Sequence, residues 1–130
     1  MARLSLRLEL GGQVRVGPGK VRLLELIDQH GSISAAGRAM KMSYRRAWLL
    51  VDELNGSFNL PVVESSSGGS GGGGARLTRF GKSVVARFRA IETKAGAAAA
   101  ADLASLAEAR RGNGKRARRS KPRQAQARGL

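Results

Sequence analysis

The residues that could carry out chemistry are few, and their spacing does not fit catalysis. The chain has no cysteine and one histidine, His30, which excludes thiol catalysis, disulfides, thiolate zinc sites and a histidine-based metal cage within one chain. No nucleophile stands beside a base, and no carboxylate pair is placed for acid–base work. Gly81, Lys82 and Ser83 match the end of a Walker A loop, but Arg76 stands where that loop needs a glycine. We therefore expect no enzymatic activity, no metal site and no cofactor.

The charge of the chain indicates a polyanionic partner instead. Its 130 residues include 24 Lys and Arg against nine Asp and Glu, a formal net charge of +15. Such an excess is typical of proteins that bind nucleic acid. No apolar run reaches the roughly 20 residues that span a bilayer, and no signal peptide is evident, so we expect a cytoplasmic protein without a membrane partner.

The basic residues are concentrated at the end of the chain. Residues 110–130 hold nine of them and no acid, with Leu130 as the one large apolar side chain. A segment that buries so little cannot offset the entropy of ordering. The sequence therefore predicts a DNA-binding domain over residues 1–109, including a C-terminal helix, and a disordered basic tail over 110–130.

The first thirty residues predict a strand and a helix. Leucines alternate with polar residues over 4–10, the period of a half-buried strand, and 14–16 extends it. Gly17–Gly19 predicts a turn before a helix over 20–30. Because apolar residues lie all round that helix, we expect it to need more than one packing partner, which hints at dimerisation.

Residues 31–56 predict two short helices joined by a tight turn, as in a helix-turn-helix. Gly31 closes the preceding helix, and Ser32 or Ser34 caps a helix over 35–40. Ser43 caps the next helix, over 44–54, which Asn55 and Gly56 end. At 100° per residue, one face of the latter helix points to the core through Ala47, Leu50, Val51 and Leu54.

The first turn of helix 44–54 offers polar residues that could meet DNA. A recognition helix places long polar side chains of its first turn against base edges in the major groove. The predicted DNA contacts are Ser43, Tyr44, Arg45 and Arg46 at the start of this helix, together with Ser34 at the start of the preceding helix. Arg45 is the predicted bidentate guanine contact. Solvated surface is the alternative for both arginines, and Tyr44 could equally pack. Trp48 is interpreted as a packing residue.

A glycine-rich hairpin is expected to follow. Strands over 60–64 and 75–77 flank a run of serine and glycine at 65–74, which predicts the wing of a winged helix-turn-helix. A flexible linker is the alternative meaning of that composition. In the wing, the residues predicted to approach DNA closely are Gly69, Ser70, Gly71 and Gly72. The basic residues predicted to hold phosphates are Arg76, Arg79 and Lys82.

A long helix should complete the fold. Thr78 can cap it, and an alanine-rich extension, interrupted by Gly96, reaches Ala109. One narrow arc of this helix needs an apolar partner and is the predicted dimer interface, made by Phe80, Val84, Phe88, Ile91 and Ala95. The fold class is thus mainly α with a small β component, a winged helix-turn-helix with a C-terminal dimerisation helix.

Two segments resemble the ModE family of molybdate-responsive bacterial transcription regulators. The resemblance covers about residues 3–95, and more distantly the first segment resembles the LysR-type helix-turn-helix. The first segment contains Gly31-Ser32-Ile33-Ser34, Met42-Ser43-Tyr44, Ala47-Trp48 and Glu53-Leu54-Asn55; the second contains Gly68 to Ala75, Leu77-Thr78 and Gly81.

The sequence departs from the family pattern in two ways. Ser65 and Ser70 stand where the family usually has basic residues. ModE proper continues into a C-terminal molybdate-binding domain, whereas this sequence continues into its basic tail. The resemblance therefore implies a stand-alone DNA-binding half, with no molybdate binding expected in this chain alone.

The combined expectation is a homodimeric regulator that binds double-stranded DNA at a palindromic operator, with a link to molybdenum metabolism implied by the resemblance. The competing hypothesis is a non-specific nucleoid or RNA-binding protein whose main actor is the tail. A third is an adaptor whose alanine-rich helix docks another protein.

Overall fold

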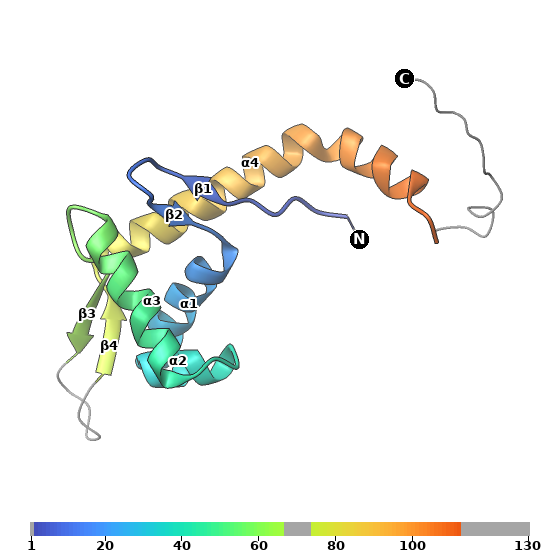
Figure 1. Cartoon of the computed structure of the whole chain (residues 1–130). Coiled ribbons are helices and arrows are strands. Elements are labelled where there is room, and N and C mark those ends of the chain that lie inside the picture. The colour runs from blue at the N-terminus through green and yellow to red at the C-terminus, as the bar shows by residue number, and fades with distance from the viewer. Residues whose placement is uncertain (1, 67–73, 113–130) are drawn as a thin grey trace. The chain divides into compact units, whose positions relative to one another are not determined.

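The computed structural model describes residues 2–66 and 74–112, which form two compact units (Figure 1). The main unit comprises Ser5–Glu92, and the second unit combines Met1–Leu4 with the chain from Thr93 onward. The described residues are mostly helical, which confirms the predicted mainly α class. Their elements are β1 (Leu8–Glu9), β2 (Arg15–Val16), α1 (Pro18–His30), α2 (Ile33–Ala39), α3 (Tyr44–Ser57), β3 (Val63–Ser66), β4 (Gly74–Leu77) and α4 (Arg79–Ala109).

The first strand is much shorter than the predicted 4–10. Only Leu8 and Glu9 pair, antiparallel to Val16 and Arg15, across a turn in which Gly11, Gly12 and Gln13 all have positive φ. The alternation nevertheless sets burial, since Leu6 and Leu8 are half-buried while Ser5, Arg7 and Glu9 are exposed. A strand extends only as far as its partner, and β2 has two residues.

Helix α1 begins at Pro18, so the predicted turn at 17–19 is wrong. Proline suits the first helical position because its fixed φ is helical and no partner is needed for an N–H. Its residues outside the main apolar stripe, Val21 and Leu26, are also buried within the chain, Val21 beside Val16 and Phe88. The all-round apolar character of α1 therefore requires no second copy of the chain.

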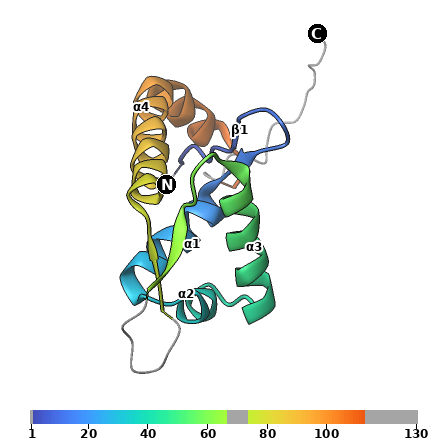
Figure 2. The ribbon, with the colours of Figure 1, turned by 90° about the vertical axis from the view of Figure 1, so that its left-hand side faces the viewer.

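Helices α2 and α3 pack closely at one end of the main unit (Figure 2). Gly31 ends α1 with φ 72°, as predicted, and Ser32 rather than Ser34 caps α2, because its Oγ accepts the N–H of Ala35 at 3.0 Å. A β-carbon built on Gly37 would lie 2.9 Å from that of Ala47, so glycine permits this crossing. Between the helices, Lys41 has φ 59°.

Helix α3 continues to Ser57, through the Asn55–Gly56 pair predicted to stop it. The Asn55 side chain instead reaches the start of β3. Its Oδ1 accepts the N–H groups of Val62 and Val63 at 2.8 and 3.0 Å, and its Nδ2 donates to the carbonyl of Val63 at 3.2 Å. A residue that favours helix ends is thus retained inside the helix by tertiary hydrogen bonds.

The β3–β4 hairpin forms as expected, with β3 three residues later than predicted. Val63 pairs with Leu77 and Ser66 with Gly74. The Ala75 N–H also donates to the Gly31 carbonyl at 3.0 Å, which fastens the start of β4 to the α1–α2 junction. The wing residues Gly69, Ser70, Gly71 and Gly72 lie outside the described residues.

Helix α4 runs through Gly96 to Ala109, as the predicted helix with its alanine-rich extension does, since a single glycine costs a helix only about 1 kcal/mol. Thr78 caps it by accepting the Gly81 N–H at 2.9 Å. The residues of the predicted dimer interface differ in burial: Phe88 is 1% exposed, whereas Ile91 is 40% exposed. The fully buried Phe88 packs on Val16 and Val21.

The other residues of the predicted dimer interface differ in their surroundings. Phe80 and Val84 are half-buried against the core, and Ala95 is half-buried. The helix ends at Ala109, and residues 113–130 of the predicted tail lie outside the described residues. Within residues 2–66 and 74–112, no helix is both long and apolar enough to cross a membrane.

Candidate nucleic-acid interface

The first turn of α3 is fixed by its cap and by its buried face. The Ser43 Oγ accepts the Arg46 N–H at 3.1 Å, while Ala47, Val51 and Leu54 are buried as predicted. Leu50 is half-buried against the same core. Burial on this face leaves the opposite face of α3 in solvent.

An exposed aromatic pair lies at the edge of the buried face. Tyr44 is 62% exposed and Trp48 40% exposed, and their rings meet edge to face with centroids 6.2 Å apart. Leu49 beside them is 54% exposed. The interpretation of Trp48 as a packing residue is therefore wrong, because its position flanks the buried face instead of belonging to it.

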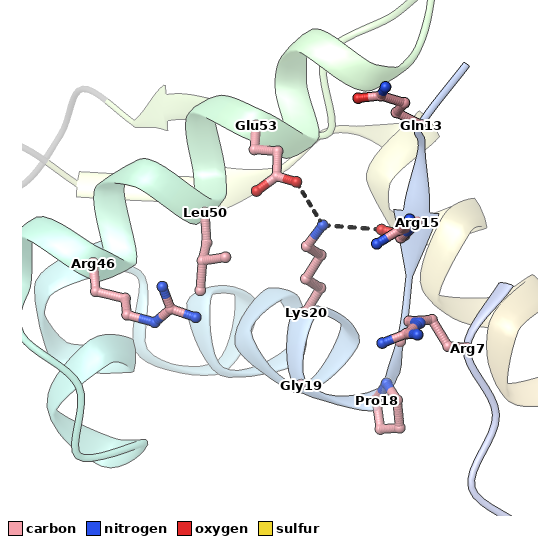
Figure 3. A pocket seen from close by; sticks show the side chains of 10 residues that line it. Arg7, Gln13, Arg15, Pro18, Gly19, Lys20, Arg46, Leu50 and Glu53 are labelled. Atoms are coloured by element: carbon pink, nitrogen blue, oxygen red, sulfur yellow. Dashed lines mark hydrogen bonds and ion pairs between the residues drawn. The ribbon is translucent and has the colours of Figure 1, made fainter. Parts of the chain in front are cut away.

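The two arginines of this turn serve different surfaces. Arg45 is exposed, one residue after Tyr44. Arg46 extends from α3 toward the first turn of α1 and lines a hollow there with Leu50 and Glu53 (Figure 3). Consecutive helical residues differ in direction by about 100°, which accounts for the separation. Ser43, Tyr44, Arg45 and Arg46 thus share one exposed helical turn, from which the Arg46 side chain extends to the hollow.

The remaining predicted contacts are more scattered. Ser34 is half-buried in the first turn of α2. Arg76 is exposed, but its Nε donates to Glu64 Oε2 at 2.9 Å across the hairpin. Arg79 and Lys82 are exposed in the first turn of α4.

That turn belongs to the opposite end of the hairpin from Ser66 and Gly74. Thr78, just before Arg79, donates its hydroxyl to the Pro61 carbonyl at 2.7 Å and its N–H to the Val62 carbonyl at 3.0 Å. Asn55, in the last turns of α3, binds Val62 and Val63. Arg79 and Lys82 therefore lie near the C-terminal end of α3, and the structure does not bring them to its first turn.

Within the main unit, an ion pair joins α1 to α4. Arg89 donates from Nε and Nη2 to the two carboxylate oxygens of Glu25 at 3.0 and 2.9 Å, and from Nη1 to Glu92 at 2.7 Å. The hydrogen bond from Arg89 holds the pKa of Glu25 below its ordinary value, and the carboxylates raise the pKa of Arg89. Both groups stay charged at neutral pH and fix the relation between the two helices.

Comparisons with known proteins find relatives whose names refer to molybdenum. No protein-family model matches the chain. Over 88 residues it is 43% identical to the molybdenum-pterin-binding protein MopA of Rhodobacter capsulatus, covering 68% of this chain and 33% of that protein. Over 92 residues it is 37% identical to the molybdenum transport protein ModE of Azotobacter vinelandii, covering 71% and 33%.

A third relative has a name that refers to DNA. The chain is 37% identical over 84 residues to the DNA-binding transcriptional dual regulator ModE of Escherichia coli K12, covering 65% of this chain and 32% of that protein. The match thus spans about a third of the length of each of these relatives. Over about 70% of its own length, the chain is ModE-like.

Proposed function

We propose that the chain is a sequence-specific DNA-binding transcription regulator of ModE type, built on a winged helix-turn-helix. The observation that carries this proposal is the exposed first turn of α3, where two arginines and an aromatic pair surround a capped helix start. Helix α2 packs against α3 in the manner of a helix-turn-helix, and the β3–β4 hairpin follows as a wing would. The relatives named as transcriptional regulators support the same function.

In this mechanism α3 enters the major groove with its first turn foremost. Arg45 donates two hydrogen bonds to the O6 and N7 atoms of a guanine. Tyr44 and Trp48 supply apolar edges that suit a thymine methyl group or a sugar. No hydrogen bond or ion pair has to be broken for this, because the side chains of Tyr44 and Arg45 form none within the described residues.

A duplex selection followed by footprinting tests this function. We expect random DNA to yield a consensus site with a discrete footprint. On that site Arg45→Ala should cost about 1–3 kcal/mol and relax the preference at one base pair per half-site. Equal weakening on the selected and random duplexes would assign Arg45 to phosphate alone.

We further propose that the chain acts as a homodimer on a palindromic operator. Leu10 and Ile91, which are 54% and 40% exposed, lie at an apolar hollow of about 230 Å³ beside α4. Ile91→Asp should therefore convert a sedimenting dimer into a folded monomer. Phe88→Asp does not discriminate, because Phe88 belongs to the core of one chain. A stable Ile91→Asp dimer would exclude this face as the interface.

The link to molybdenum rests on the relatives, whose names refer to molybdenum transport and molybdenum-pterin binding. We propose a non-catalytic regulatory role in molybdenum metabolism, with no molybdate site in residues 1–130. Calorimetry with molybdate, at an ionic strength that screens generic attraction, should show no saturable binding. A stoichiometric isotherm would contradict this proposal.

The main alternative is a non-specific nucleic-acid-binding protein, favoured by the net charge of +15. Uniform protection of DNA in the footprint, with no consensus from the selection, would establish it.

A further inference from the structure

A basic hollow of about 600 Å³ lies beside α3, between the β1–β2 hairpin and the first turn of α1 (Figure 3). All of its lining belongs to the main unit. The residues that matter are Arg7, Arg15, Lys20, Arg46, Leu50 and Glu53. Sequence periodicity gives no sign of this site, because it depends on three elements meeting in space.

Lys20 links the three elements that surround the hollow. Its Nζ donates to the carbonyl of Arg15 at 3.0 Å and to Glu53 Oε2 at 2.9 Å, which links β2, α1 and α3. The ion pair neutralises the one acid of the lining. The Lys20 side chain is 19% exposed, so its two interactions are partly shielded from water.

Three guanidinium groups then remain without protein partners. Arg7, Arg15 and Arg46 form no hydrogen bond or ion pair through their side chains within the part of the chain that the structure describes. All three line the hollow, and Figure 3 shows Arg46 on one side of Lys20 and Arg7 and Arg15 on the other. Arg46 comes from α3, Arg15 from β2, and Arg7 immediately precedes β1. The stem of Arg7 lies over Gly17, where an added β-carbon would meet its Cγ at 3.5 Å.

The chemistry of the hollow favours a phosphate group. Three like charges around one space repel each other, and an anion between them relieves that repulsion and gains charge-assisted hydrogen bonds. A volume of about 600 Å³ has room for the sugars attached to a phosphate as well. No aromatic side chain lines it, so a base has nothing to stack on.

We propose that this hollow binds a phosphodiester of the DNA backbone beside the groove that α3 enters. This inference rests on the proposed function, and it adds Arg7 and Arg15 to the interface. Arg46 is the connection, because it leaves the same helical turn as Arg45. The hollow positions the duplex without reading its sequence.

The test is a salt titration of DNA binding by fluorescence anisotropy, on the full chain and its variants. R7Q/R15Q should make the slope of log affinity against log salt less steep by about 0.9 per chain, the value for the one phosphate that the variant leaves unneutralised. It should weaken selected and random duplexes by the same factor. The control R3Q/K94Q removes two exposed charges that lie outside both hollows and should leave the slope within about 0.5 of wild type.

A second variant should act in the opposite direction. E53Q removes the acid of the hollow and releases the Lys20 ammonium, so DNA affinity should rise several-fold at low salt. Circular dichroism checks that each variant is folded. Wild-type affinity in both E53Q and R7Q/R15Q would overturn the inference.

Inorganic phosphate separates the two sources from which the ligand could come. We expect calorimetry to show no saturable binding of inorganic phosphate. The proposed backbone contact would be overturned if phosphate binding were saturable in wild type and abolished in R7Q/R15Q while DNA affinity stayed unchanged. That result would assign the hollow to a small anion. If R45A weakens DNA binding and R7Q/R15Q does not, this inference fails alone. A wild-type chain that binds no DNA overturns the proposed function and the inference with it.

Discussion

Gly81 has no side chain because the backbone of Val62 occupies the place of a β-carbon. A β-carbon there would overlap the Val62 carbonyl oxygen and lie 2.9 Å from its carbonyl carbon. The same oxygen accepts the Thr78 N–H at 3.0 Å. The likeness of Gly81-Lys82-Ser83 to a nucleotide-binding loop therefore has a structural explanation, since the glycine allows α4 to start against the β3 segment.

Gly81→Ala should destabilise the main unit by about 2–3 kcal/mol, because backbone cannot move aside as a side chain can. Urea denaturation measures this as a lower transition midpoint. Gly56→Ala is the matched control: it lies in the helical span of α3 with nothing within 4 Å of the added carbon. That variant should be stabilised by about 0.5–1 kcal/mol. Equal midpoints for Gly81→Ala and wild type would contradict the contact.

Asn55 joins the C-terminal end of α3 to the β3–β4 hairpin through three hydrogen bonds. Asn55→Ala leaves the N–H groups of Val62 and Val63 without their acceptor, and at roughly 1 kcal/mol per hydrogen bond the loss should be about 3 kcal/mol. Asn59→Ala, at an exposed position, should change stability by less than about 0.5 kcal/mol. Similar unfolding midpoints for the two variants would show that the bonds contribute little.

Among the elements, α1 and α4 are held together by an ion pair that depends on pH. Arg89 keeps the pKa of Glu25 below its value in the unfolded chain. The resulting stability is therefore present above the unfolded pKa of about 4.3 and is lost as pH falls through the lower folded value. Glu25→Gln should lose about 1 kcal/mol at pH 7, and its stability should converge with that of wild type in acid.

Thermal unfolding of both proteins between pH 2 and pH 7 measures this difference. Asp28→Asn removes an exposed acid from the same helix and should follow wild type within about 0.5 kcal/mol throughout. A constant gap between Glu25→Gln and wild type down to the lowest pH would show that the loss arises from packing instead of charge.

The sequence predicts those elements whose signals are local. Ser43 as a cap, Gly31 as a helix end and the buried face of α3 depend on neighbouring residues, and all are confirmed. The errors arise where tertiary contacts override local preference. Asn55 stays helical because β3 binds its side chain, and α1 buries Val21 and Leu26, which lie outside its main apolar stripe, inside one chain.

The candidate site is predictable from the sequence to a smaller extent. Residues 43–46 follow from the helix cap and the helical period, and the structure gathers them at one exposed turn. The packing interpretation of Trp48 fails because aromatic residues are more often buried, and period alone places this one only at a boundary. Arg7 and Arg15 join Arg46 through the meeting of distant segments, which no pattern in the sequence records.

For the whole molecule, we expect the two parts of the chain to differ in how they bind DNA: residues 110–130 contact phosphates, and residues 1–109 read the base sequence. Residues 1–109 hold fifteen basic and nine acidic residues, and residues 110–130 hold nine basic residues and no acid. Some of the charges of residues 1–109 are held in the fold, such as Lys20 in its ion pair with Glu53. A basic segment of low sequence complexity neutralises phosphates but does not select bases.

Deleting residues 110–130 should therefore lower DNA affinity without changing preference. If about half of the nine charges touch DNA, the salt slope falls by roughly four units per chain, at about 0.9 per phosphate. Salt titrations of full-length and 1–109 chains on selected and random duplexes measure both quantities. A chain in which residues 110–130 are shuffled keeps the charge and should match wild type. A lower preference for the selected duplex in the truncated or shuffled chain would show that this segment reads sequence, as a minor-groove arm does.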